Sequence, residues 1–295
     1  MSRISQTIAS GKHSLSLEFY PPKSEKAIAQ LEETSRALRQ LCPDFVSITY
    51  GAGGSTRSST LNYAGTLKDV HQYTVMPHLT CVGHSKEELH KIIEQYQSHG
   101  FQTLMALRGD PPNGAPQFSA HPEGFAYASQ LVAYIKDQFP QFEIGVGGYP
   151  EKHPEASTQS EDIQNLKKKI DAGADFITTQ LFYRNEHYFR YVDACRKVGI
   201  DCPIVPGLMI PTALEKVERF CQFCRAELPE TLRKALSQAL GDAEATRAVA
   251  LDWTFEQIQS LIENGAPGVH LYIMNQSEYA LALHQRLASA GILKR

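Results

Sequence analysis

The alternation of short apolar runs with amphipathic stretches is the feature that most constrains the fold of this chain. Eight runs are rich in β-branched, aromatic and aliphatic residues and are predicted to be strands. They cover residues 14–20, 44–50, 73–81, 101–109, 142–149, 175–182, 202–209 and 268–274. Strands that alternate with helices form parallel sheets, because two parallel strands must be joined by a crossover connection, which is usually a helix. Eight such units in 295 residues predict a (β/α)8 TIM barrel, which typically takes roughly 250 residues.

Apolar residues recur at helical spacing between the predicted strands. A helix over 24–41 is predicted to be capped by Ser24. A helix over 85–100 opens with a capping box of Ser85 and Glu88 and ends at a glycine.

The remaining helical segments bear on domain organisation. A helix over 160–174 is predicted to begin at Ser160 and to stop at Gly173, and residues 228–265 predict one or two extra helices before the last strand. No shift in composition marks a linker, so we expect one catalytic domain over 1–295. An open doubly wound sheet is the alternative. It would place a glycine-rich turn after the first strand, where this chain has YPPKSE.

Composition and charge exclude several classes of partner. Hydrophobic residues make up 42% and charged residues 21% of the chain, as in ordinary globular proteins. A formal net charge of -3 does not favour nucleic acid or an anionic membrane as a partner. No apolar run approaches the roughly 18 residues that span a bilayer, and the N-terminus lacks a signal-peptide core. We expect a cytoplasmic protein. Cys221 and Cys224 form a single CxxC, for which helix packing is favoured over redox or metal chemistry.

Strand alternation predicts which side chains face the barrel interior. Leu15, Leu17 and Phe19 suit the helix layer, so Ser16 and Glu18 are expected to point inward. The same pattern predicts further inward residues on four other strands: Ser47, Thr49, His78, Thr80, Ala106, Arg108, Asp110, Thr178 and Gln180.

The predicted inward faces are polar toward the carboxyl ends of the strands, where barrel active sites lie. A polar pocket is therefore predicted, lined by Glu18, Thr49, His78, Arg108, Asp110 and Gln180. Each residue also has a structural alternative. His78 is compatible with a hydrogen-bonded core histidine, and Arg108 with Asp110 is compatible with an ion pair. Their joint placement at one end favours the pocket.

The loops and the missing motifs narrow the chemistry. The glycines of YGAGGST (50–56) suit either a phosphate cradle or a plain tight turn, and YPEKHPEA (149–156) brings an aromatic ring and a histidine to the rim. We expect no metal, because HxH and HExxH are missing from the sequence. The predicted strands contain no Schiff-base lysine, and the chain has no GxSxG. With these mechanisms set aside, the sequence favours an inward glutamate that works beside an organic cofactor.

At these residues the chain resembles the methylenetetrahydrofolate reductase family in its short bacterial form. The motifs are LSLEFYPP, FVSITYGAGGSTR, PHLTC, LRGDPP, GGYPEKHPEA, LKKKIDAGADFITTQLFY, IVPGLM and LYIMN, and they span nearly the whole chain. The resemblance implies a FAD-containing (β/α)8 barrel that reduces 5,10-methylenetetrahydrofolate to 5-methyltetrahydrofolate. NAD(P)H would supply the electrons in a ping-pong reaction, within one-carbon metabolism and methionine supply.

The resemblance also implies roles for matching residues. Glu18 would be the general acid, with Asp110 stabilising the cation that forms when the folate ring opens. Thr49 would contact the nicotinamide, and Asp110 and Gln180 the folate. The implied FAD site comprises Tyr50, Ala52, His78, Arg108, Gly109, Asp110, Ala128, Tyr149, His153, Asp162, Asn165, Lys168 and Lys169. Glu18 could supply the proton that opens the folate ring if burial raises its pKa toward neutrality.

Two positions depart from the family pattern. Leu214 stands where a substrate-stacking aromatic is usual, and Gln276 where an arginine is frequent. We expect no regulatory domain and no inhibition by S-adenosylmethionine. A homo-oligomer is expected, and the choice between NADH, NADPH and another donor stays open. Two alternatives remain: another flavin barrel enzyme, of proline-dehydrogenase type, and a flavin- or folate-binding protein without turnover.

Overall fold

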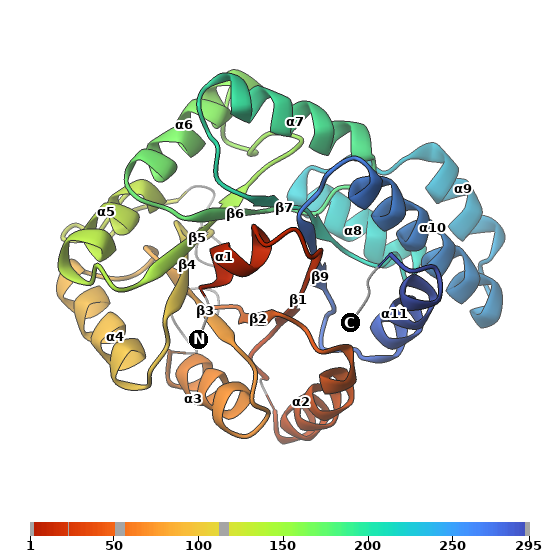
Figure 1. The fold of residues 1–295 in the computed structure, drawn as a ribbon, viewed down its shortest axis with the longest axis horizontal. Helices are drawn as coiled ribbons and strands as arrows, with labels where there is room; N and C mark the ends of the chain where they lie inside the picture. The colour runs from red at the N-terminus through yellow and green to blue at the C-terminus, as the bar shows by residue number, and fades with distance from the viewer. Residues whose placement is uncertain (1–2, 23, 51–56, 112–117, 293–295) are drawn as a thin grey trace.

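The computed structural model describes residues 3–22, 24–50, 57–111 and 118–292, and in these ranges parallel strands form a ring inside a layer of helices (Figure 1). The strands are β1 (Ser14–Phe19), β2 (Phe45–Ile48), β3 (Val75–Thr80), β4 (Thr103–Leu107), β5 (Glu143–Gly148), β6 (Phe176–Thr179), β7 (Ile204–Val205), β8 (Gly207–Leu208) and β9 (Gly268–Tyr272). Their order is β7-β6-β5-β4-β3-β2-β1-β9-β8.

The ring closes through the seventh predicted strand. That strand is split into β7, which pairs with β6, and β8, which pairs with β9. Pro206 lies between the two halves and has no N–H to donate to a neighbouring strand. Its carbonyl still accepts from His270 N at 2.9 Å. The eight predicted strands and the (β/α)8 barrel are therefore confirmed.

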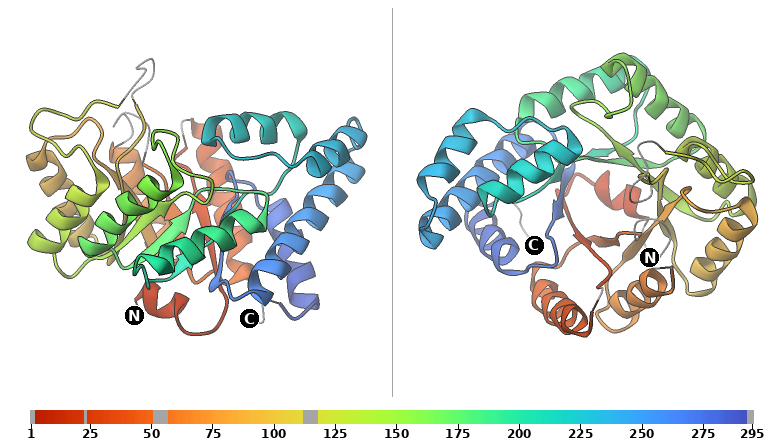
Figure 2. Two further views of the ribbon diagram at one scale, coloured as in Figure 1. Left: turned by 90° about the horizontal axis from the view of Figure 1, so that it is seen from above. Right: turned by 180° about the vertical axis from the view of Figure 1, so that it is seen from behind.

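The helices follow the predicted alternation. They are α1 (Ile4–Ile8), α2 (Glu25–Leu38), the 3-10 helix η1 (Arg39–Leu41), α3 (Arg57–Asp69), α4 (Lys86–Ser98), α5 (Ala128–Gln138), α6 (Gln159–Asp171), α7 (Asn185–Lys197), α8 (Leu214–Cys224), α9 (Glu230–Gln238), α10 (Ala243–Glu263) and α11 (Glu278–Ser289). The extra helices predicted over 228–265 are α9 and α10, which widen one flank of the barrel (Figure 2). In the described ranges, no helix combines the length and apolarity needed to cross a bilayer.

The predicted helix ends are mostly confirmed. Ser24 accepts from Ala27 N, and Ser85 with Glu88 forms the capping box. The start predicted at Ser160 is wrong, because α6 begins one residue earlier and Thr158 is its N-cap. Thr158 and Ser160 are both favoured N-cap residue types, so residue type alone does not fix which of them begins the helix. In α8, Cys221 is buried and Cys224 packs beside it in an apolar cluster, which confirms the predicted helix packing.

Apolar side chains fill the amino half of the barrel interior. Phe45, Met76, Met105 and Phe176 meet there, and the rings of Phe45 and Phe176 lie 6.2 Å apart. Helix α1 adds its own isoleucines to this cluster and closes that end of the barrel (Figure 2). The site is therefore confined to the carboxyl half.

Strand β4 has the opposite phase to the predicted one. Ala106 belongs to the outer cluster that packs against the helices, whereas Met105 and Leu107 belong to the interior. The inward prediction for Ala106 is wrong, because alanine fits either face and the neighbouring apolar residues decide. Arg108 and Asp110 lie beyond the end of the strand, so strand alternation does not orient them.

Candidate active site

Glu18 lies at the centre of a buried cluster formed by four strands. Its Oε2 lies 3.4 Å from His78 Nε2 on β3 and 3.5 Å from His270 Nε2 on β9. Ser47 Oγ on β2 donates to the same oxygen at 3.3 Å. Glu18 is 6% exposed. The predicted inward orientation of Glu18, Ser47 and His78 is confirmed.

The electrostatics of Glu18 differ from the expectation. Burial acts to raise the pKa of Glu18, but the hydrogen bond with His270 and the charges of His78 and His270 outweigh it. The pKa of Glu18 therefore lies below its ordinary value, so the condition that burial raises it toward neutrality is not met. Burial lowers the pKa of His78, which favours its neutral form.

His270 is a site residue that the sequence analysis missed. Its Nδ1 lies 2.8 Å from Ser16 Oγ, and its ring stacks on Phe45 with centroids 6.2 Å apart. The Tyr272 ring meets it edge-on at 5.2 Å. Alternation in the run GVHLYIM places His270 and Tyr272 on one face, and that signal was available in the sequence.

A second cluster covers the β4 to β6 side of the barrel mouth. The Arg108 guanidinium binds Glu155 through two contacts of 2.5 and 2.7 Å and lies 4.5 Å from the centre of the Phe118 ring. The rings of Tyr149 and His153 meet edge-on at 4.6 Å. The ion pair of Arg108 is thus with Glu155, which the sequence analysis also missed. The predicted residues Arg108, Tyr149 and His153 do come together.

Helix α6 divides its predicted residues between two faces. Asp162 is buried and accepts from His153 N at 3.1 Å, and burial raises its pKa. Lys169 Nζ donates to Gly147 O at 2.6 Å, and burial lowers the pKa of Lys169 to about 8. Lys168 and Asn165 face solvent and bond to each other at 2.9 Å. Of these four residues, Asp162 and Lys169 contact β5 or the loop that follows it.

The other predicted residues lie around the mouth. Gln180 and Thr49 are half-buried at strand ends, and Asp110 is exposed beyond β4. The Tyr50 hydroxyl lies 3.0 Å from His84 Nε2, and its ring packs in the outer cluster. Gly109 has a φ of +87°, Ala128 begins α5, Leu214 begins α8, and Gln276 is exposed after β9. Ala52 lies outside the described residues.

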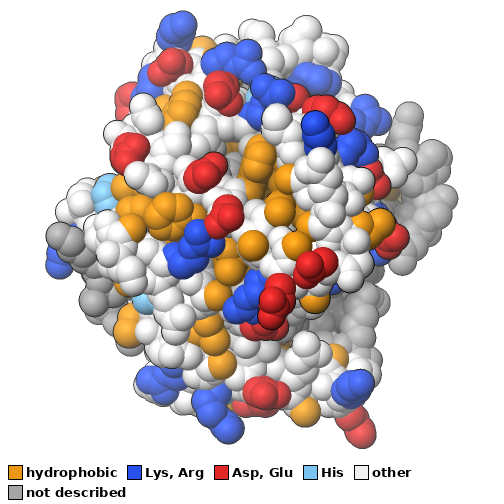
Figure 3. All heavy atoms as spheres, turned by 90° about the vertical axis from the view of Figure 1, so that its right-hand side faces the viewer, with side chains coloured by type: hydrophobic (Ala, Val, Ile, Leu, Met, Phe, Trp, Pro, Cys, Tyr) orange, Lys and Arg blue, Asp and Glu red, His pale blue; other side chains and the backbone are white. Residues whose placement is uncertain are grey.

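The flank formed by α9 to α11 carries apolar side chains scattered among charged ones (Figure 3). A groove between α10 and α11 is lined by Phe255 and Ala282, and Arg286 lies 5.5 Å from the Phe255 ring centre. The polar residues that line it, Gln285, Arg286 and Ser289, are exposed. The chemistry-bearing residues are concentrated at the barrel mouth.

Comparison with known proteins agrees with this geometry. The family model for methylenetetrahydrofolate reductase matches residues 3–288. The chain belongs to the methylenetetrahydrofolate reductase family. It is 34% identical to 5,10-methylenetetrahydrofolate reductase of Escherichia coli over 92% of this chain and 90% of that protein. It is 36% identical to methylenetetrahydrofolate reductase (NADH) 1 of Arabidopsis thaliana over 97% of this chain and 50% of that protein.

The first plant relatives are longer, so this chain spans about half of their length. Among solved structures, a Clostridium thermocellum protein described as binding two copies of 5-methyl-5,6,7,8-tetrahydrofolic acid aligns with a TM-score of 0.67 at 14% identity. The alignment covers 98% of this chain and 100% of that one. A 2,3-dimethylmalate lyase aligns with a TM-score of 0.55 at 9% identity, covering 99% of this chain and 88% of that one. Both likenesses concern the barrel fold.

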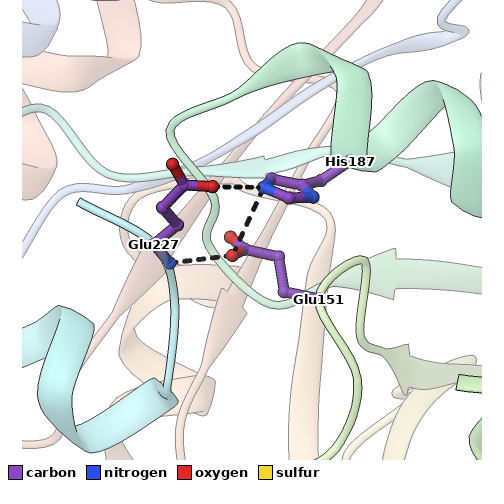
Figure 4. A group of neighbouring side chains, drawn as sticks. All are labelled: Glu151, His187 and Glu227. Carbon is purple, nitrogen blue, oxygen red and sulfur yellow. Dashed lines mark hydrogen bonds and ion pairs between the residues drawn. The ribbon is translucent and has the colours of Figure 1, made fainter. Parts of the chain in front are cut away.

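In this methylenetetrahydrofolate reductase-family barrel, a third cluster holds the loop after β5 against α7. His187 Nε2 lies 2.9 Å from Glu227 Oε2 and 3.6 Å from Glu151 Oε2, and Glu227 N donates to Glu151 at 2.8 Å (Figure 4). These three residues are spaced closely enough to hold a cation. Arg184 already pairs with Glu227 at 2.8 Å, and Arg190 contacts the His187 ring at 2.9 Å, so Glu227 has a positive partner without a cation. The cluster ties the loop that carries Tyr149 to α7.

Proposed function

We propose that this chain reduces 5,10-methylenetetrahydrofolate to 5-methyltetrahydrofolate, with FAD as its bound cofactor and NAD(P)H as the electron donor. The buried acid Glu18 at the carboxyl end of a barrel carries the proposal, together with membership of the family. The reaction would serve one-carbon metabolism and methionine supply in the cytoplasm, and we expect a homo-oligomer.

The barrel mouth suits a flat ligand with polar edges. Three inward groups, His78 Nε2, Thr80 Oγ1 and Thr178 Oγ1, are buried and have no hydrogen-bond partner among the described residues. Buried polar atoms of this kind are costly unless a ligand or water bonds to them. Among the described residues, a Cβ atom added at Gly147 would meet only Leu107, at 3.5 Å, which leaves room above β5. These features fit an isoalloxazine ring.

Charged groups near this space suit the rest of the cofactor. Arg108 and Lys169 offer positive charge on one side of the mouth, as a pyrophosphate requires, and Lys168 adds a positive charge on the exposed face of α6. Tyr149 and His153 offer ring surface beside it. Bound FAD supplies reversible hydride transfer between the nicotinamide and the methylene carbon of the folate.

The residues of the chain supply the proton and the charge. Opening the folate imidazolidine ring requires protonation of a ring nitrogen, and Glu18 is the buried acid available for it. The carboxylate of Asp110 would then stabilise the iminium cation that results. A protein that only bound folate would gain nothing from a buried carboxylate among histidines, since such burial is costly.

Anaerobic half-reactions test the proposal. The purified protein is expected to show an oxidised-flavin spectrum that NAD(P)H bleaches and methylenetetrahydrofolate restores. A colourless protein that takes up no FAD would refute the proposed function. Bleaching by proline in place of restoration by folate would support a flavin enzyme of proline-dehydrogenase type.

A further inference from the structure

His270 occupies a bridging position between two residues of the neighbouring strand. In the parallel pairing of β1 with β9, Ser16 lies opposite His270 and Glu18 lies opposite Tyr272. The His270 ring therefore contacts Ser16 with Nδ1, at 2.8 Å, and Glu18 with Nε2, at 3.5 Å. His270 is 1% exposed. A histidine buried this deeply between two polar partners is oriented by both.

The hydrogen bonds of Ser16 limit where the protons lie. Ser16 Oγ also lies 3.4 Å from Val269 O, to which its hydroxyl can donate. The serine oxygen then accepts from His270 Nδ1–H, and Nε2 faces Glu18 Oε2. A neutral Nε2 and a carboxylate oxygen are both acceptors, so this contact requires one proton between them. That proton lies either on the imidazole or on the carboxyl group.

We propose that His270, oriented by Ser16, holds the proton that Glu18 delivers to the folate. This inference rests on the proposed function. The proton moves from His270 Nε2 to Glu18 Oε2, and from Glu18 to the substrate nitrogen. The imidazole is left neutral and the carboxylate ionised, and solvent returns one proton to the pair before the next turnover. His270 does not touch the substrate, so it is a positioning residue.

The other groups that face Glu18 do not fill this role. His78 Nε2 lies at 3.4 Å but makes no hydrogen bond within the described part of the chain, and burial lowers the pKa of His78. Ser47 only donates a neutral hydroxyl. Burial and the charge of Glu18 raise the pKa of Tyr20 and of Tyr272, so both phenols stay protonated. An acid with a lowered pKa is mostly ionised at neutral pH, which is why Glu18 needs a proton source beside it.

The experiment compares His270→Gln with the matched control His71→Gln in the holoenzyme. His71 is also a buried histidine bound to a carboxylate, at 2.9 Å from Glu32, but it belongs to the outer layer. The two half-reactions are followed by anaerobic stopped-flow from pH 5 to pH 9. For His270→Gln, we expect folate-dependent flavin oxidation to slow by about 100-fold, the lower end of general-acid effects, and its fall with pH to begin at lower pH. Flavin reduction by NAD(P)H should be unchanged, and His71→Gln should match the wild type in both steps.

An unchanged pH profile in His270→Gln would overturn the proton-holding role, as would equal slowing of both half-reactions. A wild-type protein that never oxidises its flavin with folate would instead refute the proposed function. A second measurement does not depend on turnover. The 15N NMR signals of the His270 ring are expected to show two N–H groups in the wild type at pH 7 and one in Glu18→Gln. One N–H group in both proteins would contradict the proposal.

Discussion

The ion pair between Arg108 and Glu155 is predicted to set the affinity for FAD by fixing the loop after β5. The guanidinium holds both carboxylate oxygens, at 2.5 and 2.7 Å. Glu155 N in turn donates to His153 Nδ1 at 3.1 Å, beside the Tyr149 ring. The perturbation is a double-mutant cycle of Arg108→Lys, which keeps the charge but loses the fork, and Glu155→Gln, which keeps the shape but loses the charge.

The exposure of the two side chains decides the size of the effect. Glu155 is 50% exposed and Arg108 is 20% exposed, so water screens part of the attraction. Exposed pairs contribute about 0.2–1 kcal/mol, and the two-point geometry places this pair near the upper end, at about 1 kcal/mol. Since about 1.4 kcal/mol is a factor of ten, Glu155→Gln should weaken FAD binding by about fivefold.

Fluorescence titration of the apoprotein with FAD measures this affinity. The cost of the double variant should fall short of the sum of the single costs by about 1 kcal/mol, since the pair is lost only once. Arg286→Lys, the same substitution in a pair with Asp252 at 2.5 Å on the far flank, should leave FAD binding unchanged. Strict additivity of the two substitutions would refute the coupling.

Glu143 is buried and accepts hydrogen bonds from Ile4 N and Ser5 N at 2.8 and 2.9 Å. Glu143→Ala should therefore lower the free energy of unfolding, measured in urea, by about 3 kcal/mol. A loss below about 1 kcal/mol would contradict the anchoring of α1 by Glu143. The folded-state pKa of Glu18 lies below 4.5, so its ionised form stabilises the protein above that pH and this contribution is lost as the pH falls through the folded value. Below that pH the wild type should therefore lose more of its pH 7 stability than Glu18→Gln does, as measured by acid unfolding followed by circular dichroism. Equal losses of stability in the two proteins would contradict the lowered pKa of Glu18. His187→Ala removes the contacts to Glu151 and Glu227, so hydrogen exchange in residues 149–158 should accelerate several-fold, with no such change in α11.

The sequence was sufficient for the barrel and for the central acid. Apolar alternation in SLSLEFY identifies the outer face of β1, and the inward position of Glu18 follows from a period of two. The same rule failed for β4, because Ala106 and Arg108 carry little information about which face is buried. The break between β7 and β8 at Pro206 was likewise not predicted, although proline removes a strand donor.

The site partners were harder to predict because they depend on pairing between distant segments. His270 is a site residue because β9 pairs with β1, which brings it next to Ser16, 254 residues away in the sequence. Arg108 pairs with Glu155, 47 residues away, because of the path of the loop after β5, which alternation does not describe. The direction of the Glu18 pKa shift depends on two histidines from other strands, so burial alone gave the wrong sign.

Stopped-flow measurement of Glu18→Gln tests the central claim most directly. Glutamine keeps the size of Glu18 but has no acidic proton, so the variant should still bind FAD and be reduced by NAD(P)H at the wild-type rate. Its oxidation by methylenetetrahydrofolate should slow by at least about 100-fold, since general-acid catalysis contributes on the order of 100- to 10,000-fold. Folate-dependent oxidation within a few-fold of the wild type would contradict the account. Loss of both half-reactions with FAD still bound would also remove Glu18 from its role as the acid.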